Sequence, residues 1–238
     1  MNRAVLVTLS LIIIATPVSA KSKRPPPEGP GTLTAIYMVN SSQDIPANGW
    51  GGHWNQDVFN ACVNLLRAHV DSVATFYHPQ GVNLIIADTS KASQGWSATF
   101  KYLGSANGFH SISSSGYPMA VAYTEVLNGN MSPCTVMGEE IAEMLGNSRP
   151  GSICLTTSHG NRIEPEITDP VWGSDYCPRG YEPECSDTVA GPVPGFVLPA
   201  WFANKHGVAG LSAEMTFPTN VVSKPWQRTK GGAYYPCY

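Results

Sequence analysis

The pattern of apolar and polar positions along the chain predicts four strands and two helices. Short apolar runs with many β-branched and aromatic residues predict strands at residues 33–39, 82–87, 97–103 and 118–124, and the first two have the character of buried strands. Apolar positions at helical spacing predict helices over residues 55–76 and 132–147. The elements therefore follow the order strand, helix, strand, strand, strand, helix.

The segment SPCTVMGEEIAEMLGN, residues 132–147, carries the strongest helix signals of the chain. Ser132 can cap the N-terminus, and Pro133 then occupies the first helical position, where its missing N–H is not needed. Gly146 is a natural stop, with Pro150 shortly beyond it. The apolar stripe of this helix consists of Met137, Ile141, Met144 and Leu145.

Three glutamates lie beside that stripe, and they form the only dense acidic cluster of the sequence. Glu139 and Glu143 are four residues apart and lie one above the other on a helix, where like charges repel. Glu140 is adjacent to Glu139. A cation near this helix would relieve the repulsion, whereas the alternative is a solvated acidic face.

The predicted helix at residues 55–76 has a regular apolar period, whereas residues 148–195 have little. Asn55 or Asp57 can begin the first helix, whose stripe consists of Val58, Cys62, Leu65, Leu66, His69 and Val73. Residues 148–195 are instead rich in Gly, Pro and Cys and carry a second acidic patch around Glu166 and Asp169. A long irregular region in a compact domain is usually functional or is held by other means. Disulfides and a bound cation are the available means here.

Composition and the N-terminus indicate an exported chain. Residues 1–20 combine Arg3, an apolar run and small residues, the layout of a signal peptide, and residues 21–31 form a proline-rich linker. Residues 32–238 are then long enough for one domain. The net charge is −3 and no basic patch occurs, which excludes nucleic acid as a partner and, after signal removal, a membrane. We expect a secreted or periplasmic protein.

Six cysteines in an exported chain predict disulfides. Cys177 and Cys185 bracket a short loop and can pair, but the remaining connectivity stays open at this stage. No Cys-x-x-Cys or paired Cys/His spacing indicates a structural zinc site. Residues 113–116 are better explained as a turn than as a nucleophile site, because no Gly-x-Ser-x-Gly motif occurs.

Three segments, the first of them within the acidic helix, together resemble a known family. They are Glu139-Glu140-Ile141-Ala142-Glu143-Met144-Leu145-Gly146-Asn147, Glu166-Ile167-Thr168-Asp169-Pro170-Val171 and Phe196-Val197-Leu198-Pro199-Ala200-Trp201-Phe202. In this order they resemble a largely uncharacterised bacterial and phage-associated family of zincin-like metallopeptidases. That family has a His-Glu-x-x-Glu-Met-Leu-x-Asp-Pro helix, a Glu-x-x-Asp-Pro segment and a Phe-Val-x-Pro stretch. Gly108-Phe109-His110 resembles its Gly-Tyr-His element, and the likeness runs from residue 54 to residue 235.

The resemblance implies an α+β, zincin-like fold with a mixed β-sheet, a long N-terminal helix, a metal-site helix and an irregular disulfide-containing C-terminal region. It also implies peptide hydrolysis by a metal-activated water, with Glu140 as the general base. The chain departs from the family pattern at two positions: Glu139 replaces the motif histidine, and Asn147 replaces the motif aspartate. The loss of that histidine removes the nitrogen ligand that suits zinc best.

Three hypotheses about the site remain open at this stage. In the first, Glu139, Glu143 and Asp169 surround a zinc ion of an active peptidase, and His110 is the candidate for the missing nitrogen although a lone histidine is more often structural. In the second, the oxygen donors Glu139, Glu143, Asn147, Glu166 and Asp169 hold calcium in a catalytically inactive protein that binds a peptide or protein ligand. In the third, no metal binds, and the glutamates pair with Arg149 or Arg162.

Overall fold

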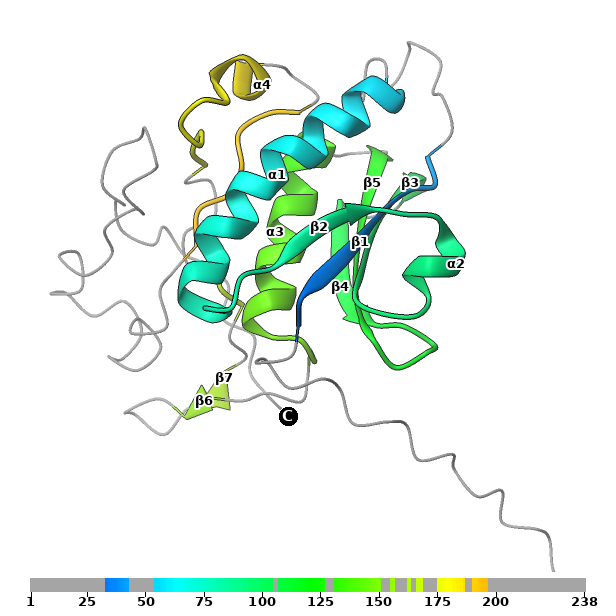
Figure 1. Cartoon of the computed structure of the whole chain (residues 1–238), viewed down its shortest axis with the longest axis vertical. Coiled ribbons are helices and arrows are strands. Elements are labelled where there is room, and N and C mark those ends of the chain that lie inside the picture. The colour runs from blue at the N-terminus through cyan, green and yellow to red at the C-terminus, as the bar shows by residue number, and fades with distance from the viewer. Residues whose placement is uncertain are drawn as a thin grey trace, which may run out of the picture.

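The computed structural model describes residues 33–42, 54–104, 107–126, 131–150, 155–156, 162–163, 166–168, 175–186 and 190–196. Its elements in chain order are β1 (Ala35–Asn40), α1 (Gln56–Tyr77), β2 (Asn83–Ile86), α2 (Thr89–Ala92), β3 (Ser97–Gly104), β4 (Gly108–Ile112), β5 (Pro118–Val126), α3 (Pro133–Gly146), β6 (Leu155–Thr156), β7 (Arg162–Ile163) and α4 (Glu182–Ser186). The predicted α+β class is confirmed (Figure 1). The signal peptide, the linker and the C-terminal stretch from residue 197 onward lie outside the described residues.

A mixed five-stranded sheet, in the order β2-β1-β3-β5-β4, forms the centre of the fold. The β1–β2, β1–β3 and β3–β5 pairs are parallel, whereas β4 pairs antiparallel with β5, so that His110 lies opposite Ala120. Parallel strands need crossover connections, and α1 supplies the one between β1 and β2. The antiparallel β4 follows from the tight turn at residues 113–116, where Gly116 has a φ of 89°.

Helices α1 and α3 pack against each other and cover the same face of the sheet (Figure 1). Helix α1 contacts β1 and β2, whereas α3 lies over β5 and β4. Alternate strand positions face these helices and are buried, as the twofold period of a strand requires. The buried strand residues on this face include Ile36, Met38, Ala98, Phe100, Ala120 and Ala122.

The ends of both long helices agree with the sequence signals. The Asn55 side chain caps α1 by accepting a hydrogen bond from the Val58 N–H. Ser132 caps α3 by accepting from the Thr135 N–H, and Pro133 is the first helical residue. Helix α3 runs through Gly146, and Asn147 is its C-cap. The predicted apolar stripe of α3 is fully buried.

Two disulfides occur in the described part of the chain. Cys62–Cys134 joins α1 to α3. Cys177–Cys185 joins a loop residue to helix α4 and confirms the predicted pairing of Cys177 with Cys185. Disulfides persist in oxidising compartments, so this finding agrees with an exported protein. None of the helices within the described ranges combines the length and apolar character that a bilayer span needs.

Three expectations about the strands and helices were wrong or incomplete. Strand β2 is buried only at Leu84: it lies at the edge of the sheet, and Ile85 and Ile86 are 43% and 45% exposed. The short helix α2 has no apolar periodicity and starts from Asp88, whose side chain caps it. Strand β4 was not predicted as a strand, because its five residues GFHSI show no strong alternation of apolar and polar residues.

Candidate metal centre

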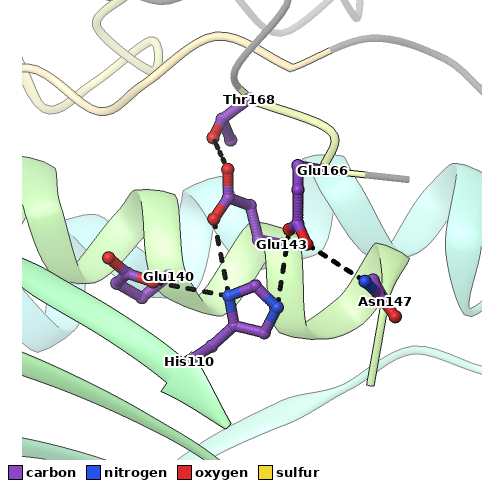
Figure 2. Close-up of polar contacts among 6 residues, drawn as sticks. All are labelled: His110, Glu140, Glu143, Asn147, Glu166 and Thr168. Carbon is purple, nitrogen blue, oxygen red and sulfur yellow. Dashed lines mark hydrogen bonds and ion pairs between the residues drawn. The ribbon is translucent and has the colours of Figure 1, made fainter. Parts of the chain in front are cut away.

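Strand β4 and helix α3 together bring one imidazole and two carboxylates into one cluster. His110 and Gly108 are two residues apart on β4, so both face α3. Glu140 and Glu143 are three residues apart on α3, so both face β4. Figure 2 shows the imidazole of His110 lying below the two glutamates. The donor atoms of His110, Glu140 and Glu143 all lie within 4.8 Å of one another.

The distances around the imidazole are nearly uniform. The Nδ1 atom of His110 lies 3.5 Å from Oε2 of Glu140 and 3.5 Å from Oε2 of Glu143. On the opposite side of the ring, Nε2 lies 3.5 Å from Oε2 of Glu166 (Figure 2). Charge-assisted hydrogen bonds between such groups are shorter, at about 2.7–2.9 Å. The carboxylates therefore surround the imidazole without closing on it.

The cluster is almost completely removed from solvent. The side chain of His110 is 7% exposed, and those of Glu140 and Glu143 are 10% and 9% exposed. Burial is the main cause that raises the pKa of Glu140, to about 7, although its contact with His110 acts in the opposite direction. Burial lowers the pKa of His110, but the neighbouring carboxylates of Glu140, Glu143 and Glu166 outweigh it and raise the pKa to about 10. Several buried carboxylates around one imidazole favour an additional cation or proton.

A second ring of polar groups fixes the orientation of these side chains. The Thr168 hydroxyl donates a hydrogen bond of 2.5 Å to Oε1 of Glu143, the oxygen that faces away from His110 (Figure 2). Asn147 Nδ2 donates to Oε1 of Glu166 at 3.0 Å. Thr168, Asn147 and Glu166 are 1%, 0% and 6% exposed. The short segment at residues 166–168 thus closes the cluster on the side away from β4.

Gly108 allows the carboxylate of Glu140 to approach the sheet. A Cβ atom at this position would lie 2.6 Å from Val136 Cγ1, 2.7 Å from the Val121 carbonyl oxygen and 2.9 Å from Glu140 Oε1. All three distances are too short for a side chain. The glycine is therefore required by the close contact between β4 and α3.

The donor set and its spacing fit a tetrahedral transition-metal ion. Two atoms that bind one zinc ion at about 2.1 Å in tetrahedral geometry lie about 3.4 Å apart. The distance from His110 Nδ1 to Oε2 of Glu143 matches this separation, and Oε2 of Glu140 lies equally close to Nδ1. Metal-ligating histidines also commonly direct their second nitrogen to a carboxylate, and ligating carboxylates accept outer hydrogen bonds. Glu166 and Thr168 lie where such outer groups would be.

The structure gathers most of the candidate residues from the sequence but gives them different positions. Glu140 and Glu143 lie at the centre of the cluster, and His110 joins them although it is distant in sequence. Glu166 and Asn147 lie on the far side of the imidazole. Glu139 is partly exposed and does not belong to the three converging donors, and Asp169 lies outside the described residues.

Two residues of the site, Gly108 and Thr168, could not be recognised as site residues from the sequence. Gly108 and Thr168 were quoted only as members of motifs, and nothing in the sequence alone shows which side of the helix they contact. Arg149 was expected to pair with the glutamates, but the ion pairs of Glu140 and Glu143 within the described ranges are with His110. The side chain of Arg162 lies outside the described part of the chain.

The chain was also compared with known proteins. No protein-family model matches it, and neither does any curated protein or any solved structure. The function therefore has to be inferred from the geometry of the site.

Proposed function

We propose that this protein is an exported, zincin-like metallopeptidase whose zinc ion is bound between strand β4 and helix α3. The observation that carries the proposal is the convergence of one imidazole nitrogen and two carboxylate oxygens within 4.8 Å in a buried site. A nitrogen donor with carboxylates suits zinc better than an all-oxygen set. His110 thus takes over the nitrogen ligation that the chain lost when Glu139 replaced the motif histidine.

The two glutamates have different roles in this proposal. Glu143 binds the ion, because the hydrogen bond from Thr168 to its outer oxygen is the kind of support that ligating carboxylates receive. Glu140 accepts the proton of the attacking water, because its burial makes it a better base than an exposed glutamate. A zinc ion held by these residues would lower the pKa of a bound water and so supply the nucleophile. Asp169, as the resemblance implies, completes the ligand set.

The architecture and the cysteines support the same proposal. A mixed sheet with an acidic helix on its face agrees with the zincin-like arrangement that the motifs imply. The two disulfides are typical of secreted and periplasmic proteins. The substrate would then be a peptide or protein outside the cytoplasm.

Metal content of the purified, oxidised protein tests the proposal first. We expect near-stoichiometric zinc in the wild type, loss of zinc in His110→Ala and in Glu143→Gln, and retention of zinc in Glu140→Gln. Glu182→Gln is the matched control, because this glutamate is exposed on α4, away from the site. A mixed-peptide cleavage assay on the same proteins should show activity in the wild type and in Glu182→Gln, and none in Glu140→Gln.

Other outcomes would replace the proposal with one of its alternatives. Calcium in place of zinc would indicate a hard-cation site in a non-catalytic binding protein. Absence of metal from the wild type, with zinc bound by Glu139→His, would indicate a disabled enzyme with an intact scaffold. Zinc without peptide cleavage would limit the function to metal binding. Loss of zinc in Glu140→Gln would make Glu140 a ligand and not the base.

A further inference from the structure

The geometry points to Glu166 as the residue that positions His110 for metal binding, with Asn147 holding Glu166 in place. This inference rests on the proposed metal site and adds to it a defined tautomer of the imidazole. Glu166 then does not bind the ion itself, in contrast to its place among the oxygen donors of the calcium hypothesis. The side chains of Asn147, Glu166 and His110 contact one another in this order, and this series of contacts, called the relay below, leaves Nδ1 of the imidazole to bind the ion.

The two nitrogens of the His110 imidazole face different carboxylates. Nδ1 of His110 is directed toward Glu140 and Glu143, and Nε2 is directed away from them toward Glu166 (Figure 2). Among the described residues, two carboxylate oxygens lie near Nδ1 and one lies near Nε2. The ion therefore fits on the Nδ1 side.

A metal ion on Nδ1 fixes the position of the imidazole proton. A neutral imidazole carries one proton, so an Nδ1 that binds metal requires the proton on Nε2. Nε2 of His110 is buried and makes no hydrogen bond to any residue within the described ranges, where Oε2 of Glu166 lies 3.5 Å from it. A movement of about 0.7 Å would turn this contact into a charge-assisted hydrogen bond. Glu166 thereby favours the tautomer that leaves Nδ1 free for the ion.

Asn147 fixes the orientation of the Glu166 carboxylate. Asn147 donates a hydrogen bond to Oε1 of Glu166, so the second carboxylate oxygen, Oε2, is the one directed at the ring. Asn147 is itself fixed as the C-cap of α3, where its N–H bonds the Glu143 carbonyl oxygen at 2.6 Å. It is 0% exposed, and the low local dielectric strengthens the contacts of Glu166. The same helix that bears Glu143 thus also orients the partner of His110.

Zinc affinity and histidine nitrogen NMR of the full mature chain test this inference. Zinc affinity would be measured by competition with a chromophoric chelator for the wild type, Glu166→Ala, Glu166→Gln and the control Glu182→Gln. We expect Glu166→Ala to weaken zinc binding by about 10–100-fold, as outer-shell substitutions do. Glu166→Gln keeps one acceptor oxygen for Nε2, and an Asn147 amide turned over can accept from its new NH2 group, so this variant should restore most of the affinity. Nitrogen-15 shifts should show zinc on Nδ1 and the proton on Nε2 in the wild type.

The outcomes separate this inference from the proposed function. If the wild type binds zinc and Glu166→Ala binds it equally well with the same tautomer, Glu166 has no positioning role. Zinc on Nε2 in the wild type would also overturn the inference and make Glu166 a ligand. If the wild type binds no zinc, the proposed function fails, and the relay fails with it. Glu166→Gln guards against misfolding, because a folded Gln variant with wild-type affinity beside a weak Ala variant supports the relay.

Discussion

The Nδ1 atom of His110 and the Oε2 atom of Glu140 lie 3.5 Å apart, although they belong to different elements, β4 and α3. This contact exists because α3 packs directly over β4 and β5, and because Gly108 lets the helix come close to the strand. A nitrogen donor is thus present at the acidic helix even though position 139 holds a glutamate.

Zinc should stabilise the metal-free protein, and His110→Ala should abolish this effect. A ligand that binds only the folded state at 100 times its Kd raises the free energy of unfolding by about 2.7 kcal/mol. Urea unfolding of chelator-treated protein, with and without added zinc, measures the difference. The control Glu182→Gln should keep the full zinc effect. A His110→Ala variant that is stabilised as strongly as the wild type would contradict the site.

Zinc binding should strengthen as the pH rises. In the metal-free protein the neighbouring carboxylates outweigh burial and raise the pKa of His110 to about 10. Zinc needs the unprotonated imidazole, so the apparent Kd should fall about tenfold per unit of rising pH while His110 remains mostly protonated. Zinc titration at pH 6.5, 7.5 and 8.5 checks this slope, and a flat profile would contradict proton competition at His110.

The raised pKa of His110 should also make the metal-free protein less stable as the pH rises. The folded-state pKa of His110 lies above the value near 6.5 of an unfolded chain, so its protonated form stabilises the folded state. This contribution is complete below about pH 6.5 and disappears as the pH rises towards 10. Zinc should therefore stabilise the protein most at alkaline pH, where His110 has lost the proton that stabilises the metal-free fold.

Much of the fold follows from local signals in the sequence. Helices α1 and α3 could be predicted because each has an apolar stripe at helical spacing and a capping side chain that accepts a hydrogen bond from its first turn. The burial of β2 could not be predicted, since its place at the sheet edge depends on the order of all five strands. Strand β4 is short, and its pairing with β5 depends on a turn and not on its own pattern.

The site could be predicted only in part, for a related reason. The glutamates of α3 are adjacent in sequence, so their grouping is a local property of the helix. The choice between Glu139 and Glu140 depends on which side of α3 faces β4, and that is a tertiary contact. His110 contributes through the position of β4, which no spacing rule connects to the helix. Its pairing with Glu143 therefore emerged only from the structure.

Acid should destabilise the protein through a second histidine, His69 on α1. Burial lowers the pKa of His69 to about 4, although its hydrogen bond to the Gly138 carbonyl acts in the opposite direction. That carbonyl only accepts, so Nε2 carries the proton, and Tyr176 donates its hydroxyl to Nδ1 at 2.9 Å. Because the folded-state pKa lies below the unfolded value, neutral His69 supports folding above about pH 6.5.

The loss of stability should occur between pH 6.5 and 4 and amount to about 3 kcal/mol for His69 alone. Urea unfolding at pH 7.5 and pH 4 measures it in the wild type and in His69→Gln. The variant is expected to be less stable at pH 7.5 but to lose less stability on acidification. An equal loss in both proteins would show that His69 does not titrate in this range.

The disulfide between the two long helices should contribute more stability than the loop disulfide. Cys62 and Cys134 are separated by 72 residues, and Cys177 and Cys185 by 8. Chain-entropy estimates give about 4 kcal/mol for the longer loop and about 2.5 kcal/mol for the shorter one. The paired variants Cys62→Ala/Cys134→Ala and Cys177→Ala/Cys185→Ala, compared by urea unfolding, test this order. A larger loss from the second pair would contradict it.

Gly108→Ala should damage the site more than it damages the fold. The new methyl group would meet the Val121 carbonyl oxygen, which is held in the sheet, and Oε1 of Glu140, which would have to move. We expect about 1–3 kcal/mol of destabilisation from overpacking. We also expect a loss of zinc affinity, because displacement of Glu140 and of β4 changes the spacing around His110. Ser111→Ala, on the opposite face of the same strand, is the control and should keep wild-type zinc affinity. A Gly108→Ala protein with wild-type zinc affinity would mean that the contact of β4 with α3 does not set the geometry of the site.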